Sequence, residues 1–177
     1  MLAYKFLRPG AVGPFSATPW PTPADGGPGA WVRATAGDRA LCAAGVHACD
    51  VDDLPFWMGE ELWRVELEDP VERRRSKLVA PAGRLVARVG AWDEAAALAF
   101  MDATVDHIRE TDTGGYMTEA EIFCVGDAGR SDPFGNAALS TMIAVEAAER
   151  AGGLDAVRAE RRRQAAWLAE RLRLTSG

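Results

Sequence analysis

The stretch ELWRVELE, residues 61–68, alternates apolar and polar side chains from Trp63 on. Its apolar side chains are Trp63, Val65 and Leu67, and the polar ones between and after them are Arg64, Glu66 and Glu68. Successive side chains of an extended chain point to opposite faces. The stretch therefore predicts a β-strand with one face in a core and the other in solvent.

A second stretch, GRLVARV at residues 83–89, repeats this alternation and carries Arg84 and Arg88 on its polar face. If the two strands pair, acids on one meet arginines on the other, which is a favourable cross-strand arrangement. Shorter apolar stretches predict further strands, at residues 2–7, 30–34, 45–49 and 76–80.

The composition changes near Trp92, because nine of the ten prolines precede it and long alanine-rich stretches follow it. Apolar spacing predicts three helices, at residues 93–110, after residues 133–136 up to Gly152-Gly153, and at about 154–173. The apolar side of the last helix is Leu154, Val157, Leu168 and Leu172. Arg161 interrupts it, so the middle turn of this helix is predicted to be exposed. The fold class predicted is α+β, as a single domain 1–177. A strand-rich, mostly antiparallel part, residues 1–92, would pack against a helical part, residues 93–177.

Bulk properties exclude several classes of protein. The chain has 177 residues and a net charge of -6, which disfavours a nucleic-acid-binding surface. No run of about 18 apolar residues predicts a membrane span, and the N-terminal residues do not resemble a secretion signal. We therefore expect a cytoplasmic protein with no membrane or nucleic-acid partner. Three cysteines in a reducing compartment predict free thiols.

The stretch LCAAGVHACD, residues 41–50, concentrates two cysteines and one histidine. On a strand, His47 and Cys49 would share a face and could touch a common ligand. They could equally be a hydrogen-bonded histidine and a small buried thiol. Zinc is a further alternative, with Cys42, His47, Cys49 and Cys124 as four ligands. However, the spacing is not a common zinc signature, and a chain of this length needs no structural metal.

Aromatic residues surround this stretch in the sequence, which contains six tryptophans in all. Trp57 follows it closely, Tyr4 lies on the first predicted strand, and Trp20 lies in a proline-rich loop where it could cover a ligand. The leading hypothesis is that a small molecule or a partner binds in a pocket. Its predicted residues are Tyr4, Trp20, His47, Cys49 and Trp57.

Six segments of the chain, in this order, resemble a family of small actinobacterial proteins of uncharacterised function. They are YKFL (4–7), PFSATPWP (14–21), CAAGVHACDVDDLPFW (42–57), EELWRVEL (60–67), KLVAPAGRLVARV (77–89) and RRRQAAWLAERL (161–172). The resemblance implies a shared fold and no particular activity.

The residues Gly45-Val46-His47-Ala48 and the pair Glu119 and Glu121 resemble parts of the ADP-ribosyltransferase fold. That resemblance implies an enzyme that uses NAD, with Glu121 as the catalytic carboxylate stabilising positive charge on the ribose and His47 beside the nicotinamide. The chain departs from the pattern, since no Ser-Thr-Ser segment precedes the glutamates.

A third hypothesis makes the chain a structural or regulatory interaction module. Its partner protein would bind the Arg161 turn of the last helix, and no small molecule would be involved.

Overall fold

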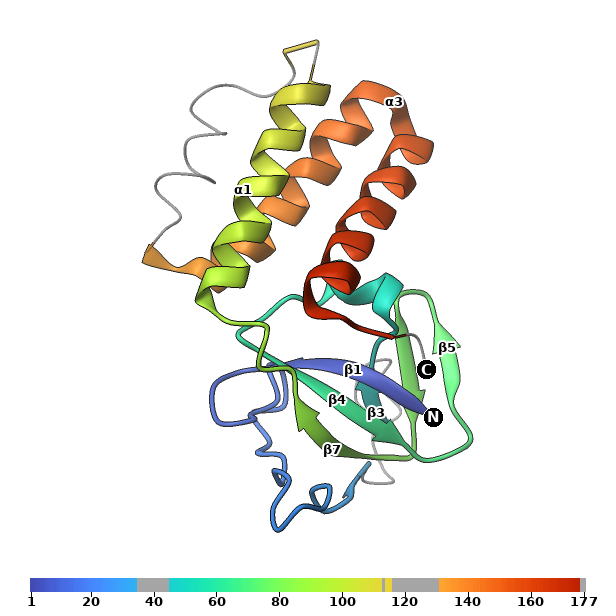
Figure 1. Cartoon of the computed structure of the whole chain (residues 1–177). Helices are drawn as coiled ribbons and strands as arrows, with labels where there is room; N and C mark the ends of the chain where they lie inside the picture. The colour runs from blue at the N-terminus through green and yellow to red at the C-terminus, as the bar shows by residue number, and fades with distance from the viewer. Residues whose placement is uncertain (35–44, 113, 116–130, 176–177) are drawn as a thin grey trace. The chain divides into compact units, whose positions relative to one another are not determined.

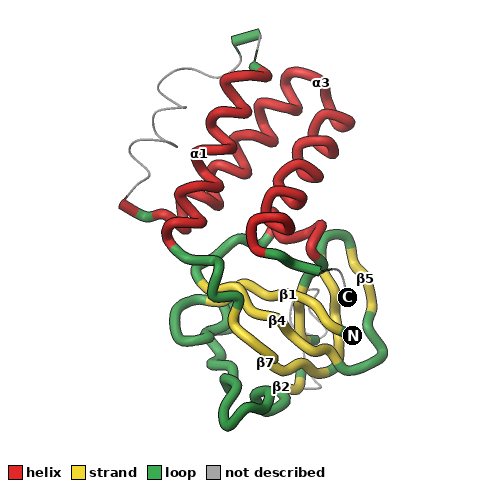
Figure 2. Tube along the Cα trace, in the orientation of Figure 1, coloured by secondary structure: helices red, strands yellow, loops and turns green. Residues whose placement is uncertain are grey.

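The computed structural model describes residues 1–34, 45–112, 114–115 and 131–175. It confirms the α+β class, because strands dominate the first half and helices the second (Figures 1 and 2). The chain divides into two compact units, one of residues Met1–Gly90 with the residues from Thr175 on, and one of residues Ala91–Leu174. The change from strands to helices falls at the residues where the composition changes.

The strand unit contains two antiparallel sheets and a short 3-10 helix. Its elements are β1 (Leu2–Leu7), β2 (Val32–Arg33), β3 (Val46–Ala48), η1 (Val51–Phe56), β4 (Glu61–Leu67), β5 (Glu72–Arg74), β6 (Lys77–Ala80) and β7 (Ala82–Arg88). The strand order is β1-β4-β7-β2 in one sheet and β3-β6-β5 in the other. A bridge between Tyr4 and Cys49, with two backbone hydrogen bonds of 2.8 Å, joins β1 to the chain just after β3. Every predicted strand is present, and β5 was not predicted.

The predicted pairing of β4 with β7 is confirmed. Arg84 on β7 lies opposite Glu66 on β4 and forms an ion pair with it at 2.6 Å. On the other face, Trp63, Val65 and Leu67 are buried in the core of this unit. The alternation from Trp63 to Leu67 therefore describes β4 correctly, while Leu62, on the predicted solvent face, is buried.

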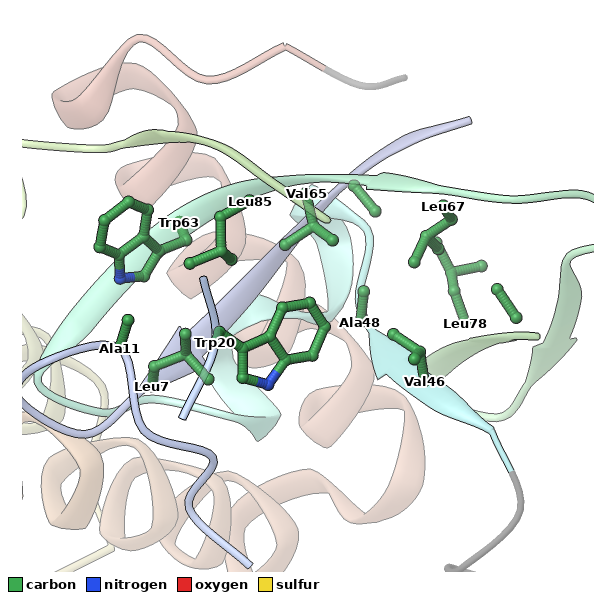
Figure 3. Close-up of a cluster of buried hydrophobic side chains, with 12 residues drawn as sticks. Leu7, Ala11, Trp20, Val46, Ala48, Trp63, Val65, Leu67, Leu78 and Leu85 are labelled. Atoms are coloured by element: carbon green, nitrogen blue, oxygen red, sulfur yellow. The ribbon is translucent and has the colours of Figure 1, made fainter. Parts of the chain in front are cut away.

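The core of the strand unit also contains Trp20, which lies among the buried side chains of the sheets (Figure 3). The loop that carries Trp20 is held by Glu61, whose carboxylate accepts hydrogen bonds from the backbone N–H groups of Gly10 and Ala11 and from Trp63 Nε1. Burial acts to raise the pKa of Glu61, but these donors and Arg88 hold that pKa below its ordinary value. Glu61 therefore serves as an ionised anchor for the loop that follows β1.

The helical unit contains α1 (Glu94–Thr111) and α3 (Pro133–Leu172). Asp93 caps α1, since its side chain accepts a hydrogen bond of 2.8 Å from the Ala96 N–H. Gly153 has a non-helical backbone (φ 65°, ψ −154°) and divides α3 into two limbs. The predicted break at Gly152-Gly153 is therefore confirmed, and the two limbs lie side by side (Figure 1).

One prediction about the second limb of α3 is wrong. Its middle turn is not exposed, because Glu160 and Gln164 are buried there and Arg161 is only partly exposed. Leu154, expected on the buried side, is 67% exposed. The middle turn is buried because it takes part in a hydrogen-bonded network. Gln164 Nε2 donates a hydrogen bond of 3.3 Å to the carbonyl of Thr141, which lies on the first limb.

Candidate functional site

The strand unit contains a cavity of about 240 Å³ beside β1 and β3. Four of the five residues predicted to bind a ligand line it, namely Tyr4, His47, Cys49 and Trp57. The other lining residues are Lys5, Phe6, Pro14, Phe15, Ala48, Phe56, Met58 and Lys77. The cavity therefore has mostly apolar and aromatic walls, with three basic side chains among them.

Tyr4 and Cys49 form a rigid part of the wall where β1 meets the chain after β3. The Tyr4 hydroxyl donates to the Thr175 carbonyl and accepts from the Thr175 N–H, each at 3.1 Å. The Cys49 thiol lies 3.5 Å from the Tyr4 carbonyl, which accepts its hydrogen bond. Burial raises the pKa of this thiol far above its ordinary value. Cys49 is therefore a structural part of the wall, without the thiolate that a nucleophile needs.

Trp57 ends the 3-10 helix η1 and connects it to the turn between β5 and β6. Its indole Nε1 donates a hydrogen bond of 2.6 Å to the carbonyl of Ser76. Ser76 directly precedes Lys77, so this bond holds the start of β6 against the end of η1. The Trp57 ring can thus form a wall of the cavity while its polar atom is satisfied.

His47 lies at the centre of β3, opposite Val79 of β6. Burial, and after it the positive charges of Lys77, Lys5 and Arg74, together lower the pKa of its imidazole from 6.5 to about 4. At pH 7 the ring is therefore neutral. A neutral imidazole offers one hydrogen-bond donor and one acceptor.

Lys5 and Lys77 are cavity residues that sequence reasoning missed. The Lys5 ammonium donates a hydrogen bond of 2.6 Å to the His47 carbonyl and lies 5.2 Å from the centre of the Trp20 ring. Burial lowers the pKa of Lys5 to about 8. The signal in the sequence was a lysine inside the apolar strand LAYKFL, together with the fact that the chain has only these two lysines.

Two phenylalanines line the cavity and are also open to solvent. Phe15 is 88% exposed and Phe56 is 48% exposed. The loop that carries Phe15 is held to the end of β1, since Arg8 Nη2 donates a hydrogen bond of 2.5 Å to the Pro14 carbonyl. Exposed aromatic rings at a cavity are typical of a surface that a ligand covers.

Trp20 does not lie where a ligand-covering residue was expected. It is 7% exposed in the core of the strand unit, and the described residues that line the cavity do not include it. Trp20 contacts a cavity residue, Lys5, through a cation–π interaction with its ammonium. A proline-rich loop predicted exposure, but the loop folds back so that Trp20 N–H donates to the Ala11 carbonyl at 2.9 Å.

Four residues of the earlier hypotheses lie outside the described residues, namely Glu119, Glu121, Cys42 and Cys124. The catalytic role of Glu121 with NAD and the zinc site therefore stay predictions. Within the ranges that the structure describes, no group of three or more His, Cys, Asp or Glu side chains could hold a metal ion. Arg161, expected to present a turn to a partner, is half-buried and donates to Gln164 Oε1 at 3.4 Å.

Comparisons of the chain with protein families, with curated proteins and with solved structures give no match. The resemblances described from the sequence therefore stay predictions. No described helix is both long enough and apolar enough to cross a membrane.

Proposed function

We propose that the protein binds a small molecule with an apolar body in the cavity between β1, β3 and η1. The observation that carries this proposal is the convergence of Tyr4, His47, Cys49 and Trp57 on one cavity. Tyr4 comes from β1, and the other three come from residues 47–57, more than 40 positions later in the sequence. Tertiary structure therefore had to bring them together.

The size and the walls of the cavity support a ligand of about one or two rings. Ligand pockets are commonly lined by apolar and aromatic groups, with a few polar groups that fix orientation. Here the apolar surface comes from aromatic rings and Met58, and the polar groups are His47 and the two lysines. At about 240 Å³, the cavity is smaller than the roughly 300–1,000 Å³ of typical drug-sized pockets.

Binding, and not a reaction, is the function that this geometry supports. Cys49 is held as a neutral buried thiol, and His47 has no nucleophile hydrogen-bonded to its ring in the described part of the chain. Both side chains nevertheless suit a cavity wall. We include a cytoplasmic location in the proposal, since the thiol of Cys49 is free in the structure.

The experiment measures binding of cinnamamide, a neutral molecule with one aromatic ring, by ligand-detected NMR and calorimetry on the full chain. We expect binding that falls at least about tenfold, or about 1.4 kcal/mol, in both His47→Ala and Trp57→Ala. His107→Ala is the matched control, because His107 is the other histidine of the chain and belongs to the helical unit.

Each variant is first compared with the parent chain by circular dichroism, so that loss of the fold is recognised. Unchanged binding in folded His47→Ala and Trp57→Ala proteins would show that the cavity is not the site. No binding to the parent chain would also overturn the proposal for a ligand of this kind.

A further inference from the structure

Building on the proposed ligand cavity, we infer that its ligand carries a negative charge, such as a carboxylate, which Lys5 and Lys77 bind. The apolar body of the ligand would lie against the aromatic walls. The inference depends on where the positive charges of this unit lie and on how the nearby negative charges are used.

The first step is the distribution of lysine. The chain has 20 basic residues of the Lys and Arg types, of which only Lys5 and Lys77 are lysines. Both line the cavity, as does His47. They come from β1 and β6, which are far apart in the sequence. Lysine presents a compact charge on a flexible stem, which suits contact with a single anionic group.

The second step is that the acids near the cavity are already used. Asp50 and Asp53 form ion pairs with Arg73 at 2.7 and 2.9 Å, and Glu72 accepts a hydrogen bond from Arg74 Nε at 2.9 Å. Among the described residues, no Asp or Glu lines the cavity. Neither lysine is in an ion pair within the part of the chain that the structure describes.

The third step is that positive charges gather around His47 and lower its pKa. The groups facing His47 are Lys5 and Tyr4 from β1, Lys77 from β6 and Arg74 from β5. Burial comes first and these positive charges second in lowering the His47 pKa to about 4, and burial lowers the Lys5 pKa to about 8. The protein has a net charge of -6, but this cavity is locally positive, with no acidic side chain among its described lining residues. An anion would supply a counter-charge and raise both pKa values.

The experiment compares cinnamate with cinnamamide, which have the same ring and chain but differ by one charge. We expect cinnamate to bind the full chain about tenfold more tightly than cinnamamide at pH 6, and the preference to weaken as pH rises from 6 to 9 while Lys5 loses its proton. Lys77→Met should weaken cinnamate much more than cinnamamide and so remove most of the preference. Arg158→Met is the matched control, because it removes one positive charge from an exposed position of the helical unit.

The outcomes separate this inference from the proposed function. If cinnamamide binds as tightly as cinnamate, or if Arg158→Met reduces the preference as much as Lys77→Met, the anion site is wrong and the cavity proposal stands. If Lys77→Met weakens both probes equally, Lys77 acts through the shape of the cavity and the inference is also wrong. If neither probe binds the parent chain, the proposed function fails and the anion preference fails with it.

Discussion

The two histidines of the chain lie in opposite kinds of charged surroundings. In the helical unit, His107 Nε2 lies 3.2 Å from a carboxylate oxygen of Glu160, whose side chain is 3% exposed. Arg163 donates two hydrogen bonds of 2.8 Å to the same carboxylate, and Gln164 donates one of 2.7 Å. In the strand unit, His47 has Lys5 and Lys77 beside it and no acid on the described cavity wall.

The difference teaches how to separate a structural cluster from a candidate binding site. Glu160 has partners within its own unit for its charge and for its oxygen atoms, so nothing outside the chain is required. A buried charge without a partner is costly. Lys5 bears this cost, since burial lowers the pKa of its ammonium to about 8, and a ligand could relieve it. A cavity of about 360 Å³ also lies beside His107 and Glu160, so a cavity alone does not distinguish the two regions.

The largest effect that would test this comparison is expected in the His107 cluster. Glu160→Ala removes the carboxylate and leaves Arg163, His107 and Gln164 without their shared partner. We expect the free energy of unfolding to fall by about 3–5 kcal/mol, measured by urea denaturation. Glu146→Ala is the matched control, since Glu146 pairs with Arg150 on an exposed surface and should cost about 0–1 kcal/mol. An equal, small effect for both would mean that the cluster is not a stabilising network.

A smaller effect on the free energy of unfolding, of opposite sign, is expected from a substitution at the cavity. Lys5→Met removes a buried ammonium whose pKa is lowered to about 8. Removing this buried charge should stabilise the fold, but the loss of the hydrogen bond to the His47 carbonyl offsets part of that stabilisation. We expect unfolding at pH 7 to become about 1–2 kcal/mol less favourable, while binding of cinnamate weakens.

Stabilisation with loss of binding is typical of a functional residue. Lys77→Met provides the comparison, because Lys77 is only partly buried, and we expect a smaller gain in stability. A loss of stability in Lys5→Met would show that the hydrogen bond and the contact with Trp20 outweigh the cost of burying the charge.

The smallest effect is a pH dependence at His47. The folded state holds the His47 pKa near 4, while the unfolded chain binds this proton near pH 6.5. The unfolded state therefore binds more protons between these values, and the free energy of unfolding falls as pH drops from about 6.5 to about 4. Since the ring is half-exposed, we expect about 1 kcal/mol between pH 7 and pH 5. Comparison of urea denaturation curves at these two pH values should show this dependence reduced in His47→Gln. An unchanged pH dependence in that variant would mean that other groups cause it.

Local patterns predicted much of the fold because they depend on neighbours in the sequence. Alternation located β4 and β7 and predicted that acids would face arginines across them, as Glu66 and Arg84 do, and Gly153 located the break in α3. The same reasoning predicted the wrong exposure for Leu154 and the Arg161 turn, because an apolar stripe does not reveal a buried polar network. Glu160 and Gln164 are polar by type, and each also has a partner in another helical segment, His107 of α1 for Glu160 and the Thr141 carbonyl for Gln164.

The sequence by itself determined the order of strands and helices and pointed to Tyr4, His47, Cys49 and Trp57. These features follow from the alternation of side chains, helix caps and the density of aromatic residues, which are all local. Only the tertiary structure decided that Trp20 belongs to the core and that Lys5 and Lys77 join His47 at one cavity. The reason is that burial and electrostatic interaction depend on distances between segments that are remote in the sequence. The two lysines are 72 positions apart, and no local pattern reports that both line the same cavity.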